Sequence, residues 1–334
     1  MDENGKKRTK PICRRDWVLI LILLAIVVVA AVAILAVRRN SIRTRLAAIR
    51  EAGYPTSFAE MEEYNRLPEG VENAAYLYVK AFNIFARPSD VNVPIFPEGA
   101  ELPARGEPLP EAMAKAISEY LKENRDCLAL LRKGAGIEYC LYREDYLAGI
   151  ATHLQEAREC SKLVELAAIL CGDQGDTDAV VGYINDGLRL ADSLVRKPYL
   201  ISYLARIGCI GLFLSGLERT LSATAFSDGQ LRRLDDMLSR TEESLDMTDA
   251  LATDRAGVIE IFQDPSLLPE MEDITRWMRM PLIGRTGLID YLDYTADCMQ
   301  ALELSGMQRI MRLHEIVNFR TFISCSSRVG ESLD

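Results

Sequence analysis

The sequence predicts an all-α protein in which one N-terminal transmembrane helix is followed by an antiparallel α-helical array with a Pro-rich loop. Three observations support this. The run from Trp17 to Val37 holds 21 residues without a charged side chain. Apolar residues from Leu147 to Cys171 recur at the 3.6-residue spacing of an amphipathic helix. Six of the thirteen prolines lie between Pro88 and Pro110, where they interrupt the helical pattern because proline lacks a backbone donor.

The apolar run is predicted to be a membrane anchor. As a helix it rises about 31 Å, close to the roughly 30 Å hydrocarbon core of a bilayer. We expect an uncleaved signal-anchor, so that the protein crosses the cell membrane once. A cleaved signal peptide is the alternative, since Ala31-Val32-Ala33 has the small residues of a cleavage site. The apolar run nevertheless exceeds the usual 7 to 15 residues or so and continues through Ile34 and Leu35.

The chain is predicted to divide into segments of different composition. In order they are a basic N-terminal tail (1–16), the transmembrane helix (17–37), a basic juxtamembrane helix (38–53), a short helical hairpin (54–86), the Pro-rich loop (87–110) and an acidic α-helical domain (111–334). The first 50 residues hold 11 Lys/Arg against 3 Asp/Glu, a net of +8, whereas the remainder holds 28 against 46, a net of −18.

This charge division predicts the partners. The segment from Trp17 to Val37 is expected to insert in the lipid bilayer, and the flanking Lys/Arg are expected to bind anionic headgroups. The acidic remainder repels phosphate backbones, which excludes nucleic acid. Six Lys/Arg precede Trp17 and five follow the span, so the positive-inside rule slightly favours an N-terminus in the cytoplasm and a C-terminal domain outside it.

Beyond the anchor the pattern is helical. We expect residues 111–134 to form one helix, and another long helix to run from Ser227 to Asp264. The Pro-rich loop is expected to lie as a strap over the helical core, with a partner-binding polyproline segment as the alternative. The stretch "IEYCLY" after Gly136 is either a short strand or merely extended.

The segment 198–217 is apolar on nearly every helical face. It is either the central helix of a soluble core or a second membrane span. Arg206 near its middle favours the core, because an arginine in mid-bilayer costs on the order of 2.5–3.5 kcal/mol. Its small residues, Gly208, Gly211, Ser215 and Gly216, are expected to allow close contact with helices on either side.

No residue is predicted to be catalytic, cofactor-binding or metal-ligating, and the sequence favours a protein that is not an enzyme. Only two histidines occur, and "HEIVN" at His314 has Asn318 where a zinc protease needs its second ligand. His153 is expected to be structural. Three groups of carboxylates occur. Asp173, Asp176 and Asp178 are expected to form a capped turn. Two groups are expected to be solvated helix faces, namely Glu242/Asp246/Asp249 and Asp290/Asp293/Asp297.

The eight cysteines are scattered singly without a C-x-x-C pair, so most of them are expected to be small core residues. Cys160 and Cys171 are predicted to share one helix about 16 Å apart, too far for a disulfide. If the domain is exported, a disulfide between Cys127 and Cys140 is the alternative that the sequence leaves open.

The stretch "GYPTSFAEMEEYNRLPEGVENAAYLYVKAF" resembles a large family of uncharacterised bacterial single-pass membrane-anchored helical proteins. The resemblance also includes the Gly175-Asp176 turn and covers most of the chain, but it brings no biochemical activity. Some members end in a pseudopilin-like tail, and Glu331-Ser332-Leu333-Asp334 is similar to its opening. The resemblance therefore implies a tail cut short here.

Three function classes fit the sequence. A membrane-tethered helical scaffold or protein-interaction module predicts a binding groove without clustered acids. An accessory protein of a secretion or pilus-like system is the alternative, and it depends on the tail resemblance. A hydrolase using carboxylates is the weaker alternative, and it requires a deep pocket with two close carboxylates.

Overall fold

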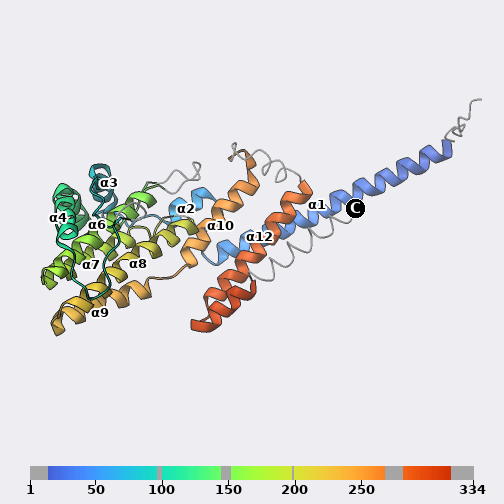
Figure 1. Ribbon diagram of the computed structural model, residues 1–334. Helices are drawn as coiled ribbons and strands as arrows, with labels where there is room; N and C mark the ends of the chain where they lie inside the picture. The colour runs from blue at the N-terminus through green and yellow to red at the C-terminus, as the bar shows by residue number, and fades with distance from the viewer. Residues whose placement is uncertain (1–13, 96–99, 144–151, 198, 268–280, 317–334) are drawn as a thin grey trace, which may run out of the picture. The chain divides into compact units, whose positions relative to one another are not determined.

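The computed structural model describes residues 14–95, 100–143, 152–197, 199–267 and 281–316, and the regular structure in them is helical (Figure 1). This confirms the predicted all-α class with a long apolar N-terminal helix. The helices are α1 (Arg14–Glu51), α2 (Phe58–Tyr64), α3 (Ala75–Ile84), α4 (Glu111–Glu123), α5 (Arg125–Ala135), α6 (Leu154–Asp173), α7 (Thr177–Asp192), α8 (Leu200–Ala223), α9 (Asp228–Glu243), α10 (Thr248–Gln263), the 3₁₀ turn η2 (Pro265–Leu267) and α12 (Pro281–Leu302). Residues 306–316 are also helical.

The "IEYCLY" stretch is extended. Within the described residues it makes one isolated parallel bridge, between Asn73 and Tyr139. The Asn73 side chain reinforces the bridge, because its amide donates to the carbonyl of Leu141 at 2.9 Å and its oxygen accepts from the backbone N–H of Leu141 at 2.9 Å.

The chain folds into two compact units, one combining α1 with described residues of 261–296 and the other comprising 54–260 with described residues of 297–334. In the first unit, α1 is long and apolar enough to span a membrane, and the large side chains from Trp17 to Val29 are exposed. Beyond the apolar run, Arg45 makes a two-pronged ion pair with Asp293 of α12, at 2.7 and 2.9 Å. Arg285 of α12 donates to the carbonyl of Leu35 at 3.3 Å.

The core of the second unit is formed by α6, α7 and α8, which lie side by side and pack against one another (Figure 1). Their mutual faces bury leucine, isoleucine, valine and alanine side chains, as the 3.6-residue pattern predicts. Gly187 allows α7 to approach α8 closely, because a Cβ there would lie 2.3 Å from Cε1 of Phe213. The apolar spacing of Val180, Ile184, Leu188, Ala191 and Val195 predicts that helix α7 also buries Val195. This prediction is wrong, because α7 ends at Asp192 and Val195 is exposed.

Helix α8 belongs to this core through Arg206, which is only 1% exposed. Its guanidinium donates to Oδ1 of Asp192 at 2.8 Å and to the backbone carbonyl of Ser244 at 2.8 Å. The expectation that Arg206 lies in a protein core is therefore confirmed. Although α8 is long and apolar enough for a membrane span, a charge held this way favours a protein interior over lipid.

The same arginine explains a wrong prediction. The helix expected from Ser227 to Asp264 is interrupted between α9 and α10. In a continuous helix the carbonyl of Ser244 would accept from the N–H of Thr248. Here Arg206 uses that carbonyl, and the N–H of Thr248 donates to Oδ1 of Asp246 at 2.9 Å instead.

A second long helix is also divided. Residues 111–134 form α4 and α5, which meet at the buried Asn124. The Asn124 side chain pairs with the backbone of Ala86, accepting from its N–H at 2.9 Å and donating to its carbonyl at 3.0 Å. Its amide also donates to the carbonyl of Tyr120 at 3.1 Å. A bond to a distant segment thus sets the break, which local helix propensity does not reveal.

Gly187→Ala is expected to destabilise the protein, because the added Cβ collides with the ring of Phe213 and overpacking of this kind costs about 1–3 kcal/mol. Gly182→Ala on the same helix is the matched control. Its Cβ would meet only Nη2 of Arg132, at 3.6 Å, so it should be neutral or stabilising by up to ~1 kcal/mol. Thermal denaturation of the full-length protein in detergent, followed by circular dichroism, measures both. Equal melting temperatures for the two variants would contradict the packing described here.

Candidate functional site

The segment that joins α3 to α4, residues 85–110 and here termed the strap, contains no helix or strand among its described residues (96–99 lie outside them). It is tied to the helices behind it. Asn124 holds Ala86 at its start. Near its end, the N–H of Leu109 donates to Oδ1 of Asp173 at 2.8 Å. Val93 and Leu109 are buried. The predicted strap over the helical core is confirmed.

Arg219 of α8 holds the second half of the strap. This buried side chain donates to the carbonyl of Pro103 at 2.5 Å and to that of Glu107 at 3.0 Å. On the surface next to it, Arg105 pairs with Glu218 at 2.5 Å. Proline-rich backbone forms no regular ladder of hydrogen bonds, and the Arg219 side chain supplies donors to two of its carbonyls.

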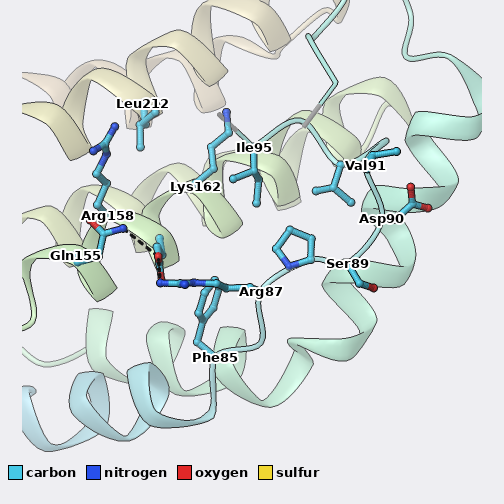
Figure 2. Close-up of a pocket in the computed structure, with 13 residues that line it drawn as sticks. Phe85, Arg87, Ser89, Asp90, Val91, Ile95, Gln155, Arg158, Lys162 and Leu212 are labelled. Carbon is cyan, nitrogen blue, oxygen red and sulfur yellow. Dashed lines mark hydrogen bonds and ion pairs between the residues drawn. The ribbon is translucent and has the colours of Figure 1, made fainter. Parts of the chain in front are cut away.

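A cavity of about 510 Å³, here termed the strap groove, lies between the first half of the strap and helices α6 and α8. Figure 2 shows Phe85, Val91 and Ile95 on the strap side, facing Arg158 and Lys162 of α6 and Leu212 of α8. The remaining lining residues are Arg87, Pro88, Ser89, Asp90, Val93, Gln155 and Glu159. The lining thus combines an apolar wall with charged side chains of both signs.

The charged groups of the groove are mostly paired. Arg87 contacts Glu159 at 2.5 Å, and Gln155 donates to the same carboxylate at 2.9 Å (Figure 2). Lys162 donates to Glu165 at 2.7 Å. Arg158 is exposed and has neither a hydrogen bond nor an ion pair with the residues that the structure describes. It is therefore the cation of the groove that is available to a ligand.

Glu165 lies in the interior behind Lys162 and is buried. Burial raises the pKa of its carboxyl, and the pairing with Lys162 only partly opposes this. A Cβ on Gly216 of α8 would lie 3.0 Å from Cγ of Glu165, so α8 packs directly on this carboxylate. Glu165 thus positions Lys162 at the groove.

A second cavity of about 690 Å³ lies on the other side of the strap, against α4. It shares Pro88, Ser89, Asp90 and Val93 with the strap groove. Its charged lining is balanced between acids and bases, and comprises Asp90, Lys115, Glu119, Lys122, Glu123 and Arg125. This balance gives it no preference for a ligand of either sign.

The strap groove adjoins an apolar face of α8 that faces solvent. Gly208 and Ser215, four residues before and three after Leu212, lie on the same side of the helix as Leu212. The exposed residues of this face are Ile201, Leu204, Ile207, Gly208, Gly211, Leu214 and Ser215. Of the small residues expected to contact neighbouring helices, Gly216 lies close to α6, whereas the expectation is wrong for Gly208 and Gly211, beside which a Cβ would meet nothing within 4 Å.

The two histidines lie in different segments, and neither lines the two cavities. His153 precedes α6 in a left-handed backbone conformation, with its ring 5.8 Å from that of Phe82 and 5.6 Å from that of Tyr142. His314 is exposed in the helical residues 306–316, and Asn318 lies outside the described residues. The prediction of a structural His153 fits this aromatic packing.

The three carboxylate groups cap a helix, pair with other side chains or backbone, or face solvent: Asp173 accepts from Leu109, Asp249 from Tyr64 and Asp293 from Arg45. Asp176 caps α7, accepting from the N–H of Ala179 at 3.0 Å. Asp178 accepts from Gln230 and Arg233, and these hydrogen bonds lower its pKa. Both remaining groups are exposed throughout, and they are Glu242/Asp246/Asp249 and Asp290/Asp293/Asp297. Among the described residues no three His, Cys, Asp or Glu side chains gather as a metal site.

The cysteines differ from expectation in one respect. The sulfur of Cys127 lies 4.0 Å from that of Cys160, and both side chains are buried. Cys140, the partner considered from the sequence, instead makes a hydrogen bond with Tyr142 that lowers its pKa, although burial dominates and raises it to about 12. The pairing across α5 and α6 depends on tertiary packing and was not visible in the residue spacing.

Comparisons of the chain with models of protein families, with curated proteins and with solved structures found no match. The resemblance to anchored helical proteins therefore stays a hypothesis from the sequence. The groove residues were missed by the sequence analysis, because Arg158 and Lys162 look like ordinary polar positions of an amphipathic helix. Their i, i+4 spacing beside a predicted strap was the available signal.

Glu165→Gln is expected to change how stability depends on pH. Because the folded state raises the pKa of Glu165, the folded protein binds this proton more tightly than the unfolded chain. Its stability therefore gains as pH falls toward the raised pKa, and a glutamine lacks that gain. Denaturant unfolding at pH 7 and pH 5 should show wild type gaining on Glu165→Gln at the lower pH. The exposed Glu242→Gln is the control, and a Glu165→Gln curve parallel to wild type would refute the prediction.

Proposed function

We propose that the protein is a membrane-tethered interaction module whose acidic domain lies outside the cytoplasm and binds a segment of a partner protein in the strap groove. The partner segment is apolar with acidic side chains. In this proposal helix α1 anchors the module in the bilayer, and the domain binds a partner without catalysing a reaction.

The composition of the strap groove carries this proposal. In a part of the chain with a net charge of −18, the groove lining holds three cations, Arg87, Arg158 and Lys162, against two anions, Asp90 and Glu159. Its wall is apolar, with Phe85, Val91, Val93, Ile95 and Leu212 among its residues. Concave, mostly apolar sites with a few placed polar groups are typical binding sites. The apolar face of α8 extends the surface beside Leu212, and such faces mark interaction sites.

The alternative functions have less support. A hydrolase using carboxylates needs two close acids in a pocket, whereas Glu159 of the groove is paired with Arg87 and Asp90 lies on the strap. An accessory role in a secretion or pilus-like system rests on Glu331–Asp334, which lies outside the described residues. The interaction module is therefore the function that we propose.

An acidic amphipathic peptide should bind the full-length protein in nanodiscs, and Arg158→Glu should weaken that binding at least about tenfold. The physical reason is that an acidic ligand gains from the available guanidinium and is repelled by its replacement, a difference of about 1.4 kcal/mol or more. Fluorescence anisotropy with a labelled peptide of glutamate and leucine measures the affinity.

Arg232→Glu is the matched control, because Arg232 is an exposed arginine of α9 that does not line the strap groove. It carries the same change in net charge. A peptide in which lysine replaces glutamate should bind Arg158→Glu better than wild type. Equal loss of binding in Arg158→Glu and Arg232→Glu would show that only the overall charge matters, and the groove proposal would fail.

The proposed orientation is tested with reporters fused after Leu313. One reporter works only outside the cytoplasm, and the other works only inside it. If the domain is exported, the first reporter is active and the second is silent. The basis is the count of six Lys/Arg before the span against five after it. The reverse pattern would place the domain in the cytoplasm and overturn this part of the proposal.

A further inference from the structure

We infer that Cys127 and Cys160 form a disulfide in the mature protein, cross-linking α5 to α6 behind the strap groove. This inference rests on the proposed location of the domain outside the cytoplasm, where disulfides form and persist. It does not depend on what the groove binds.

The geometry brings the two sulfurs together and leaves little to change. Their separation is 4.0 Å across 33 positions of sequence, whereas a disulfide needs about 2.05 Å. The difference is about 2 Å, within reach of side-chain rotation with a small helix shift. The buried Cys209 is not a candidate for this disulfide, because its sulfur makes a hydrogen bond with Ser161 instead of lying beside a second cysteine.

The surroundings also favour reaction of Cys127. It is the third residue of α5 (Arg125–Ala135), so it lies in the first turn, where the helix dipole stabilises a thiolate. The hydroxyl of the buried Tyr120, near both thiols, has no hydrogen-bond partner among the described residues. Burial raises the pKa of this hydroxyl most, and the electrostatic effect of the two cysteines raises it further.

The oxidation requires an electron acceptor, for which a protein dithiol–disulfide oxidoreductase of the export compartment is the chemical class. The Cys127 thiolate attacks a sulfur of the oxidant's disulfide and releases one oxidant thiolate. The Cys160 thiolate then attacks the sulfur of Cys127 and releases the second. The two cysteines lose two electrons and two protons, and the oxidant becomes a dithiol. Because both thiols are buried in the fold, the reaction must precede the final packing of α5 on α6.

The cross-link would act on the frame of the groove. Cys160 lies between Arg158 and Lys162, which line the strap groove, and Cys127 follows Arg125, which lines the second cavity. A bond between these positions therefore fixes the two helices that flank the strap. Closing a loop of this length stabilises the fold chiefly by restricting the unfolded chain.

The test uses the full-length protein in its own membranes. Acid first quenches thiol exchange, the protein is then unfolded in denaturant near neutral pH with N-ethylmaleimide to block free thiols, and the digest is examined by mass spectrometry before and after reduction. We expect the peptides of Cys127 and Cys160 to be joined, two hydrogens lighter than their sum and free of the blocking group. Reduction of the purified protein should lower its melting temperature by roughly 5–15 °C.

The variants separate this inference from the proposed function. Cys127→Ala should leave Cys160 open to blocking, whereas Cys209→Ala should leave the joined peptides unchanged. If the reporters show export and both thiols are blocked in wild type, the disulfide is wrong while the interaction module stands. If the reporters show a cytoplasmic domain, the location and the disulfide fail together.

Discussion

The buried guanidinium of Arg206 is the constraint on which the domain depends. A charge in a protein interior must be paired and hydrogen-bonded, because its desolvation is otherwise too costly. Asp192 at the end of α7 pairs with the guanidinium and the carbonyl of Ser244 after α9 accepts from it, while its buried Nε has no hydrogen-bond partner among the described residues. One side chain thus connects three helices, and α8 can be a core helix only in this register. With one side of α8 committed to the core, its apolar opposite face is left to solvent beside the strap groove.

The strap shows the same principle in a segment without regular structure. Its backbone cannot form a helical ladder, so Asn124 and Arg219 of the core supply hydrogen bonds to Ala86, Pro103 and Glu107. These contacts fix the strap at Ala86, before the groove-lining residues, and at Pro103 and Glu107, after them. The strap is thus held on both sides of the groove by side chains that do not line it.

Local periodicity predicted much of the fold. The long apolar run correctly predicted the helix α1, and the 3.6-residue stripes correctly predicted the buried faces of α6 and most of α7. A helix that buries one face carries apolar residues along that face, so the sequence shows which face is buried. The predictions failed where a distant partner decides the local structure. The breaks at Asn124 and Ser244 each depend on a partner 38 positions away. The groove and the Cys127–Cys160 contact likewise depend on helices far apart in sequence, so a single sequence does not display them.

A binding groove between a strap and helices has one wall without regular structure, whose backbone can change conformation when a ligand binds. Helices α6 and α8 are joined by a buried core, in which Gly216 meets Glu165 closely, so that wall is rigid. The opposite wall, Phe85–Ile95, is held at Ala86 and by the burial of Val93, while Val91 and Asp90 between them are exposed. Residues between two anchors can adapt to a ligand without disturbing the core. The fold thus places a rigid basic and apolar wall opposite an adaptable one, an arrangement suited to recognising a segment of another protein.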